Sequence, residues 1–168
     1  MNCPSCGAPM RLEENKDYLV CDYCGNIHVA DVNDDGVRVL DETTPAVENP
    51  ECPLCALPLF DAAVDGQRIL YCRRCRGMLI PMDIFAPLIE DLRSRIEGHA
   101  ELVHALDPKE LERHIRCPRC RRDMETHVYG GGGNVVISDC EQCQVNWLDH
   151  GELNRIVRSP DHQFSYGL

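Results

Sequence analysis

The chain reads CPRC at residues 117–120 and CEQC at residues 140–143. Between these two C-x₂-C pairs, residues 125–129 and 135–139 flank the glycines at 130–133, which predicts a β-hairpin with a loose turn. Two cysteines three positions apart in a tight turn aim both sulfurs at one point, and the proline after the first cysteine favours that turn. A hairpin that joins the two turns therefore supplies four sulfurs around one centre.

The same arrangement occurs three times along the chain, which is an internal repeat. All 12 cysteines fall in C-x₂-C pairs, with 14, 16 and 19 residues between the pairs of a set and 27 and 41 residues between sets. Each set begins with Cys-Pro. The candidate metal ligands are therefore Cys3, Cys6, Cys21 and Cys24 in the first set, Cys52, Cys55, Cys72 and Cys75 in the second, and Cys117, Cys120, Cys140 and Cys143 in the third.

Four sulfurs in a tetrahedron indicate Zn²⁺ or iron. Disulfides and redox-active dithiols are the alternatives, but no signal-peptide run follows Met1 and no βαβ pattern surrounds a C-x₂-C pair. We therefore expect three Zn²⁺ ions per chain, all structural, because four protein ligands leave no open position for catalysis.

Aromatic residues make up only 5% of the chain, so a large apolar core is poorly supplied. We expect metal binding to hold each small module together. On this hypothesis the three sites are independent, and Cys120→Ser unfolds the third module while two ions stay bound.

The predicted fold class is a set of small, metal-stabilised, β-rich modules: three zinc ribbons and an α-helical linker. The first ribbon takes residues 1–41, the second 51–82, and the third 116–158 with its closing helix. Residues 42–50 form a polar linker, 83–115 the helical linker, and 159–168 a tail.

The strands of the first two ribbons are predicted at residues 10–13 with 18–20, and at 59–64 with 67–71 around the favoured turn pair Asp65-Gly66. A further short hairpin is predicted from residues 27–32 and 37–40.

Three sequence signals predict where helices begin. Because proline fits only the first turn of a helix, Pro87 predicts a start near Ala86. Asp107-Pro108 predicts a second start, with the aspartate as N-cap. Glu152, three residues after Asp149, predicts a capping box at a final short helix.

The third unit continues past Cys143 as Trp147-Leu148-Asp149 and then Gly151-Glu152-Leu153. Together with its cysteines, this resembles the bacterial and archaeal zinc ribbons named after transcription factor IIB, whose members read C-P-x-C … C-x-x-C-x-G-x-W-L-D-x-G-E-L. The resemblance implies that the four cysteines bind zinc, that Trp147 packs on the hairpin, and that Asp149 and Glu152 start the closing helix.

The second unit matches that pattern less closely. Gly77 agrees with it, but Leu79 stands where tryptophan is usual and Pro81 where aspartate is usual. In the third unit, Val145 replaces the glycine of the pattern. The first unit is a generic zinc ribbon that ends in Cys24-Gly25.

The formal net charge is −11, and a chain this acidic is not generally attracted to nucleic acid. No apolar run reaches the length of a membrane span, and no phosphate-binding or catalytic motif is evident. We therefore expect a cytoplasmic protein without enzymatic activity or a small-molecule substrate, which acts as a protein-binding adapter or accessory subunit.

The alternative is a transcription-associated factor that binds nucleic acid through arginines near the second and third sets of cysteines. These arginines are Arg73, Arg74, Arg76, Arg116, Arg119, Arg121 and Arg122. They would contact phosphates or an acidic partner, or else offset the charge of the thiolate centres.

Overall fold

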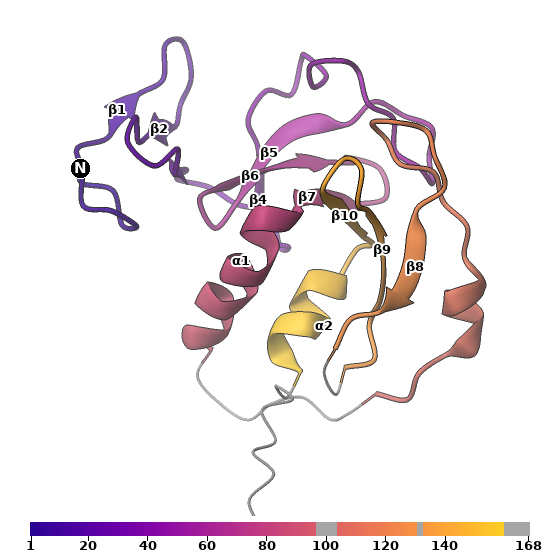
Figure 1. The fold of residues 1–168 in the computed structure, drawn as a ribbon. Helices are drawn as coiled ribbons and strands as arrows, with labels where there is room; N and C mark the ends of the chain where they lie inside the picture. Colours follow the sequence, from indigo (N-terminus) through magenta and orange to yellow (C-terminus); the bar gives the residue numbers. More distant parts are fainter. Residues whose placement is uncertain (97–103, 131–132, 160–168) are drawn as a thin grey trace, which may run out of the picture.

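The computed structural model describes residues 1–96, 104–130 and 133–159. It contains a three-stranded sheet in the order β1-β2-β3 and a seven-stranded sheet in the order β4-β5-β6-β7-β10-β9-β8 (Figure 1). The strands are β1 (Arg11–Leu12), β2 (Leu19–Val20), β3 (Ile27–His28), β4 (Val37–Val39), β5 (Phe60–Val64), β6 (Gln67–Tyr71), β7 (Met78–Pro81), β8 (Glu125–Val128), β9 (Val136–Cys140) and β10 (Val145–Leu148). The helices are α1 (Met82–Ser94), the 3₁₀ helix η1 (Pro108–Glu112) and α2 (Glu152–Arg158).

The predicted hairpin of each ribbon is confirmed. β1 pairs with β2, β5 with β6, and β8 with β9, all antiparallel. The turn between β5 and β6 is made by Asp65 and Gly66, with φ of 46° and 78°, as expected for the turn pair found there. The fold class of metal-stabilised zinc ribbons is therefore confirmed, and the structure contains an α-helix in the predicted linker and another after the third ribbon.

The second and third ribbons join into one sheet, because β7 pairs with β10. In this pair Leu79 lies directly opposite Trp147. Each of these residues comes four positions after the last cysteine of its ribbon, Cys75 or Cys143. The strand order is therefore symmetric about this pair, with β7, β6 and β5 on one side and β10, β9 and β8 on the other. The expectation of three independent modules does not hold for this pair, whose strands form one hydrogen-bonded ladder.

The two faces of the seven-stranded sheet carry different cores. On one face α1 and α2 pack against the sheet, with Phe85, Leu88 and Ile156 buried among its apolar side chains. On the other face Leu79 and Trp147 pack with cysteines of the second and third ribbons. Successive residues of a strand point to opposite faces, so each ribbon contributes to both cores. Burial of apolar side chains therefore contributes more to this fold than the low aromatic content indicates.

Helix α1 begins at Met82, four residues before the predicted start at Ala86. Pro87 lies inside the helix and is exposed to solvent, at the cost of one backbone hydrogen bond. Phe85, in the turn before this proline, is buried against the sheet. The prediction was wrong because it weighed the local penalty of proline and not this tertiary packing.

Residues 27–40 do not form the predicted hairpin. β3 pairs with β2, whereas β4 pairs with β5 at the edge of the large sheet. This arrangement ties the first ribbon to the second, since Ile27 N–H donates to the Gly66 carbonyl at 2.8 Å and Ile27 is buried beside Ala63. Sequence periodicity could not distinguish a local partner from a distant one for strands this short.

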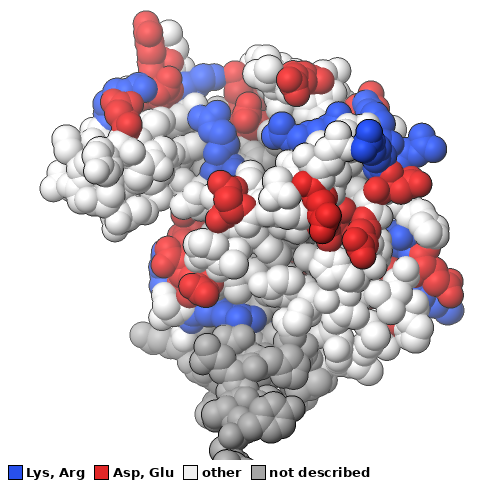
Figure 2. Space-filling view, viewed as in Figure 1, with Lys and Arg blue, Asp and Glu red and all other residues white. Residues whose placement is uncertain are grey.

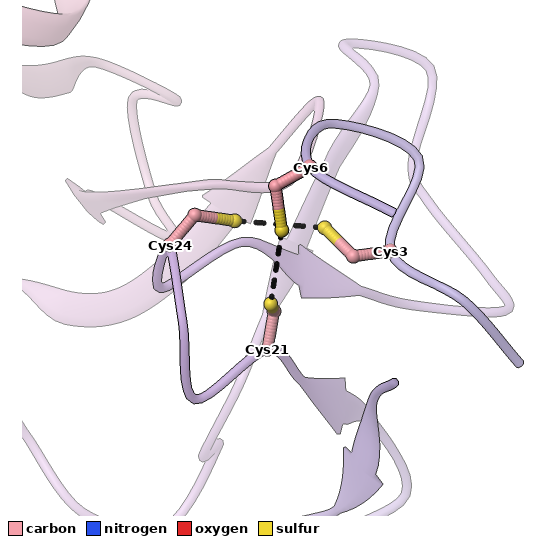
Figure 3. A group of neighbouring side chains, drawn as sticks. All are labelled: Cys3, Cys6, Cys21 and Cys24. Atoms are coloured by element: carbon pink, nitrogen blue, oxygen red, sulfur yellow. Dashed lines mark hydrogen bonds between the residues drawn. The ribbon is translucent and has the colours of Figure 1, made fainter. Parts of the chain in front are cut away.

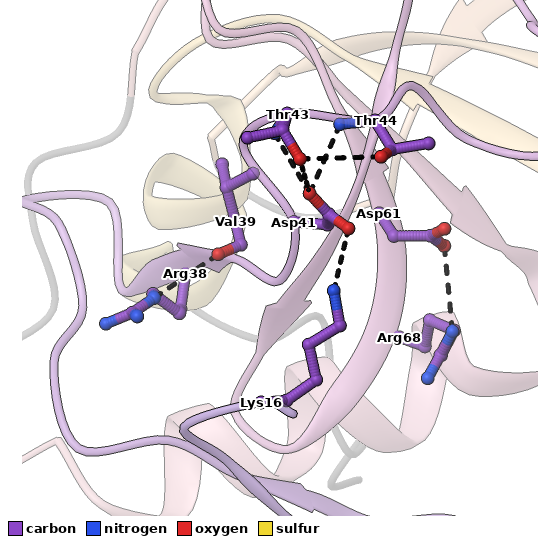
Figure 4. Close-up of polar contacts among 8 residues, drawn as sticks. All are labelled: Lys16, Arg38, Val39, Asp41, Thr43, Thr44, Asp61 and Arg68. Carbon is purple, nitrogen blue, oxygen red and sulfur yellow. Dashed lines mark hydrogen bonds and ion pairs between the residues drawn. The ribbon is translucent and has the colours of Figure 1, made fainter. Parts of the chain in front are cut away.

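A polar contact next to β4 also joins these parts of the chain (Figure 4). The Asp41 carboxylate accepts hydrogen bonds from Lys16 Nζ at 2.7 Å and from the backbone N–H of Thr43 at 2.9 Å. The Lys16 ammonium is the main reason that the pKa of Asp41 lies below its ordinary value. The residues predicted as a linker thus begin with an ordered turn.

The remaining helix signals are confirmed in part. Asp107 caps η1 by accepting the backbone N–H of Lys109 at 3.0 Å, but the helix has only 5 residues and is 3₁₀ in type. In the described parts of the chain, neither α-helix is long and apolar enough to span a membrane.

Candidate metal centres

The structure brings the 12 cysteines together in three groups of four, the same sets that the spacing predicts. Within each group the Sγ atoms all lie within 4.8 Å of one another. In the first group Cys3 and Cys24 approach to 3.5 Å, as do Cys6 and Cys21 (Figure 3). A tetrahedron with Zn–S bonds of about 2.3 Å has S–S edges of about 3.8 Å. The groups therefore fit a four-coordinate Zn²⁺ ion, and the sulfurs are too far apart to be disulfides.

Backbone geometry aims the sulfurs in every group. We call the loop with the first cysteine pair of a ribbon its front knuckle, and the loop with the second pair its rear knuckle. In all six knuckles the residue after the second cysteine has a left-handed conformation: φ lies between 53° and 77° at Gly7, Gly25, Ala56, Arg76, Arg121 and Gln144. Only two of these residues are glycines, so four non-glycine residues are held in a disfavoured conformation. Sulfur coordination and a backbone hydrogen bond, such as that from Ala56 N–H to the Cys52 carbonyl, offset the cost of this conformation.

The three groups differ in burial. Cys6 and Cys24 of the first group are exposed, whereas no cysteine of the second or third group is. The first group is also supported by strands of only two residues each. The second and third groups lie against the core around Trp147. We infer that the first ion is the easiest to remove.

Chelation should therefore release zinc in two phases. With excess EDTA and a chromogenic zinc indicator, we expect one of the three ions to leave faster than the other two, because a chelator reaches Cys6 and Cys24 without opening the core. The control is Cys24→Ser, which should lack the fast phase. Release of all three ions at one rate, or a fast phase that survives in this variant, would contradict the assignment.

The thiols of the third group differ in acidity. The backbone N–H of Arg122 is the main reason that the pKa of Cys120 is lowered to about 7, whereas burial raises the pKa of Cys143 to about 12. An incoming Zn²⁺ ion must therefore displace protons, and zinc affinity decreases as the pH falls.

Trp147 and Asp149 connect this metal centre to the closing helix and to the linker. The indole Nε1 of Trp147 donates to Asp149 Oδ1 at 2.9 Å, and the Asp149 backbone N–H donates to Glu152 Oε2 at 2.6 Å. Arg113, which follows η1, forms an ion pair with the second oxygen of Asp149. The glutamate half of the predicted capping box is present, but the Asp149 side chain binds Trp147 and Arg113 instead of the helix. The N-cap of α2 is Gly151.

Glu152 is buried, and burial raises its pKa to about 7 from a usual 4.5. Between these two pH values the folded chain keeps a proton on Glu152 that the unfolded chain has lost, so this residue lowers stability as the pH rises. Glu152→Gln keeps an acceptor for the Asp149 N–H and carries no charge. We expect the variant to be more stable than the native chain by roughly 1–3 kcal/mol above pH 7 and to approach it near pH 5.

Denaturant unfolding of both proteins across this pH range measures the effect. Proton competition at the zinc thiolates opposes the trend, but it is common to both proteins and cancels in their difference. A difference that does not grow with pH would show that Glu152 is ionised in the folded chain.

Most of the seven arginines predicted to contact a partner have neighbours within the chain. Arg121 pairs with Glu51 at 3.1 Å, Arg76 with Asp35 at 3.7 Å and Arg116 with Asp123 at 3.9 Å. Arg73 donates to the Glu42 carbonyl at 2.8 Å and lies 5.0 Å from the centre of the Phe60 ring. Arg74, Arg119 and Arg122 are exposed and have no ion pair among the described residues. Figure 2 shows basic side chains at several places on this face, most of them toward the upper right, with acidic side chains beside them.

Sequence reasoning missed two features. Gly77 lies against the Trp147 ring, so a Cβ at this position would come within 2.2 Å of the ring. Leu54 and Leu57, in the front knuckle of the second ribbon, are 47% and 40% exposed. The exposed leucines could have been found from the sequence, because Leu54 and Leu57 lie on either side of Cys55 in a short loop. The contact of Gly77 with Trp147 depends on the pairing of distant strands, which no local pattern reveals.

The fold and the three groups of cysteines define a zinc-ribbon protein with three Zn²⁺ sites. Residues 116–159 match the family described as transcription factor zinc-finger, of the transcription factor IIB zinc-ribbon type, which confirms the resemblance of the third unit. No curated protein and no solved structure matched the chain.

Proposed function

We propose that the chain is a non-catalytic adapter or accessory subunit that binds another protein. The observation that supports this most is the coordination of the three centres. Each group offers four thiolates to one ion, and a Zn²⁺ ion with four protein ligands has no position left for a substrate or a reactive water. Zinc in such a site stabilises a rigid surface.

The charge of that surface favours a protein over nucleic acid. The chain is acidic overall, and Arg76, Arg116 and Arg121 face carboxylates of the chain itself. Phosphate binding depends on arginines and lysines that displace counterions, and neighbouring carboxylates reduce that gain.

Affinity capture of the tagged, zinc-loaded chain from an extract of its own cells tests the proposal. The extract is treated with nuclease and recovered proteins are identified by mass spectrometry. We expect the same partner in repeated captures, at a constant ratio to the chain and with nuclease present. Loss of every partner on nuclease treatment, or recovery of none, would contradict the adapter function.

Nucleic-acid binding is the second candidate, because Arg74, Arg119 and Arg122 are exposed and free of carboxylate partners in the described residues. If these side chains bind phosphates, oligonucleotide affinity must decrease steeply as salt increases. A binding assay at two salt concentrations decides, since absent or salt-insensitive binding rejects this candidate.

A further inference from the structure

The front knuckles of the second and third ribbons adjoin, and one carries exposed apolar side chains while the other carries arginines. Residues 52–57 form the first of these knuckles and residues 117–122 the second. We call this region the knuckle surface, and it consists of Leu54, Leu57, Arg116, Arg119, Arg121 and Arg122.

One contact shows that the two knuckles are neighbours. Arg121, in the third ribbon, reaches across to Glu51, the residue before Cys52 of the second ribbon. The knuckles also rest on a common core, because Cys52 and Cys117 belong to the same buried cluster as Trp147. The apolar and the basic residues of the knuckle surface therefore belong to one rigid unit.

Both knuckles are fixed by backbone hydrogen bonds as well as by metal coordination. In the second ribbon, Cys52 N–H donates to the Leu57 carbonyl at 2.8 Å and Ala56 N–H to the Cys52 carbonyl at 2.9 Å. The third ribbon repeats this pattern between Cys117 and Arg122, at 2.8 Å. A partner that docks here orders little additional backbone, which lowers the entropic cost of binding.

The apolar half of this surface consists of two partly exposed leucines. Leu54 is 47% exposed and Leu57 is 40% exposed. Backbone hydrogen bonds fix the loop that carries them. Leucine side chains presented on a rigid loop gain free energy when a partner covers them.

The other half carries more arginines than carboxylates on an acidic chain. The four arginines and the two carboxylates of Glu51 and Asp123 give a side-chain balance of 4 − 2 = +2. The third centre, with four thiolates and one Zn²⁺ ion, adds −4 + 2 = −2, so this half is close to neutral on a chain whose formal net charge is −11. The Arg116–Asp123 pair is weak, since its atoms are 3.9 Å apart and both side chains are more than three-quarters exposed. The guanidinium groups of Arg119 and Arg122 are exposed and have no ion pair among the described residues.

We propose that the knuckle surface docks an acidic segment of a partner protein that also carries apolar side chains. The carboxylates of the segment pair with Arg119 and Arg122, and its apolar side chains cover Leu54 and Leu57. This inference rests on the proposed adapter function. Nucleic acid fits less well, because the surface has no aromatic side chain for base stacking and the leucines offer nothing to phosphates.

Fluorescence anisotropy tests the proposal with the full zinc-loaded chain. The probe is a labelled synthetic peptide in which glutamates alternate with leucines and phenylalanines. The comparison probes are a polyglutamate peptide of equal length and at least equal charge, and a single-stranded oligonucleotide. We expect the mixed peptide to bind about tenfold more tightly than polyglutamate, because covering two half-exposed leucines contributes about that much.

Two double variants separate the contribution of the leucines from that of the arginines. Leu54→Ser combined with Leu57→Ser should remove the preference for the mixed peptide, and Arg119→Glu combined with Arg122→Glu should weaken binding of both peptides. The matched control is Leu12→Ser, which removes a leucine that is 63% exposed in the first ribbon and should change nothing. Zinc content and circular dichroism establish that each variant is folded.

Three results would overturn the proposal: equal affinity for the two peptides, a preference that survives in the double serine variant, or tighter binding of the oligonucleotide that depends on the arginines alone. A separate capture experiment distinguishes failure of this surface from failure of the proposed adapter function. A partner captured equally well by the native chain and by the double serine variant would leave the adapter function in place and exclude this surface.

Discussion

Cys120→Ser should reduce the zinc content of the purified chain from three ions to one. The third centre shares a sheet and a buried core with the second, through the pairing of β7 with β10. A structural zinc contributes about 10–16 kcal/mol of apparent binding free energy, which equals or exceeds the usual stability of a whole domain. Loss of the third ion therefore unfolds the unit that holds the second ion as well. This expectation replaces that of independent sites, under which two ions stay bound.

Elemental analysis of the purified variant measures the ion count, and circular dichroism follows the helices that lie on the shared sheet. The control is Cys24→Ser, which should lose one ion of the three and keep both helices, because the first group is outside the shared core. Two ions and intact helices in Cys120→Ser would show that the second ribbon folds without the third.

Gly77→Val should destabilise the joined ribbons by about 3 kcal/mol or more, at the upper end of the cost of overpacking. A Cβ on residue 77 would lie 2.2 Å from Cζ2 of Trp147. The indole ring cannot move aside, because Trp147 is 0% exposed and its Nε1 is bound by Asp149. Urea unfolding measures the loss, with the fluorescence of Trp147, which is the only tryptophan in the sequence, as the signal.

Gly130→Ala is the matched control, since a Cβ at that position meets nothing within 4 Å. We expect its effect to stay within about 0.5 kcal/mol. If the Gly77→Val variant keeps native stability and native Trp147 fluorescence, the tight contact between Gly77 and the Trp147 ring is absent.

The parts of this fold that depend on local chemistry could be predicted from the sequence. Cysteine spacing identifies the ligand sets, because a knuckle and a hairpin are short-range structures with residue-specific signals. The turn at Asp65 and Gly66 and the cap at Asp107 are of the same kind. Each of these features depends on residues that lie close together in the sequence.

The long-range features could not be predicted in this way. The pairing of Leu79 with Trp147, the placement of β4 beside β5, and the ion pair of Arg113 with Asp149 join segments far apart in the chain. Strands of two to five residues are too short for their sequence pattern to predict which strands they pair with. The predicted start of α1 was wrong for a related reason, because the burial of Phe85 outweighs the local cost of Pro87 within the helix. The contact of Gly77 with Trp147 is a consequence of the same unpredicted pairing.

The pairing of β7 with β10 also matters during synthesis on the ribosome. β7 is complete at residue 81, but β10 ends at residue 148, so a long interval of translation separates the two. Throughout it, the emerging chain presents Leu79 and Ile80 on an open strand edge, which is a template for intermolecular pairing. A transcript truncated before the third ribbon should therefore yield a product that aggregates through this edge.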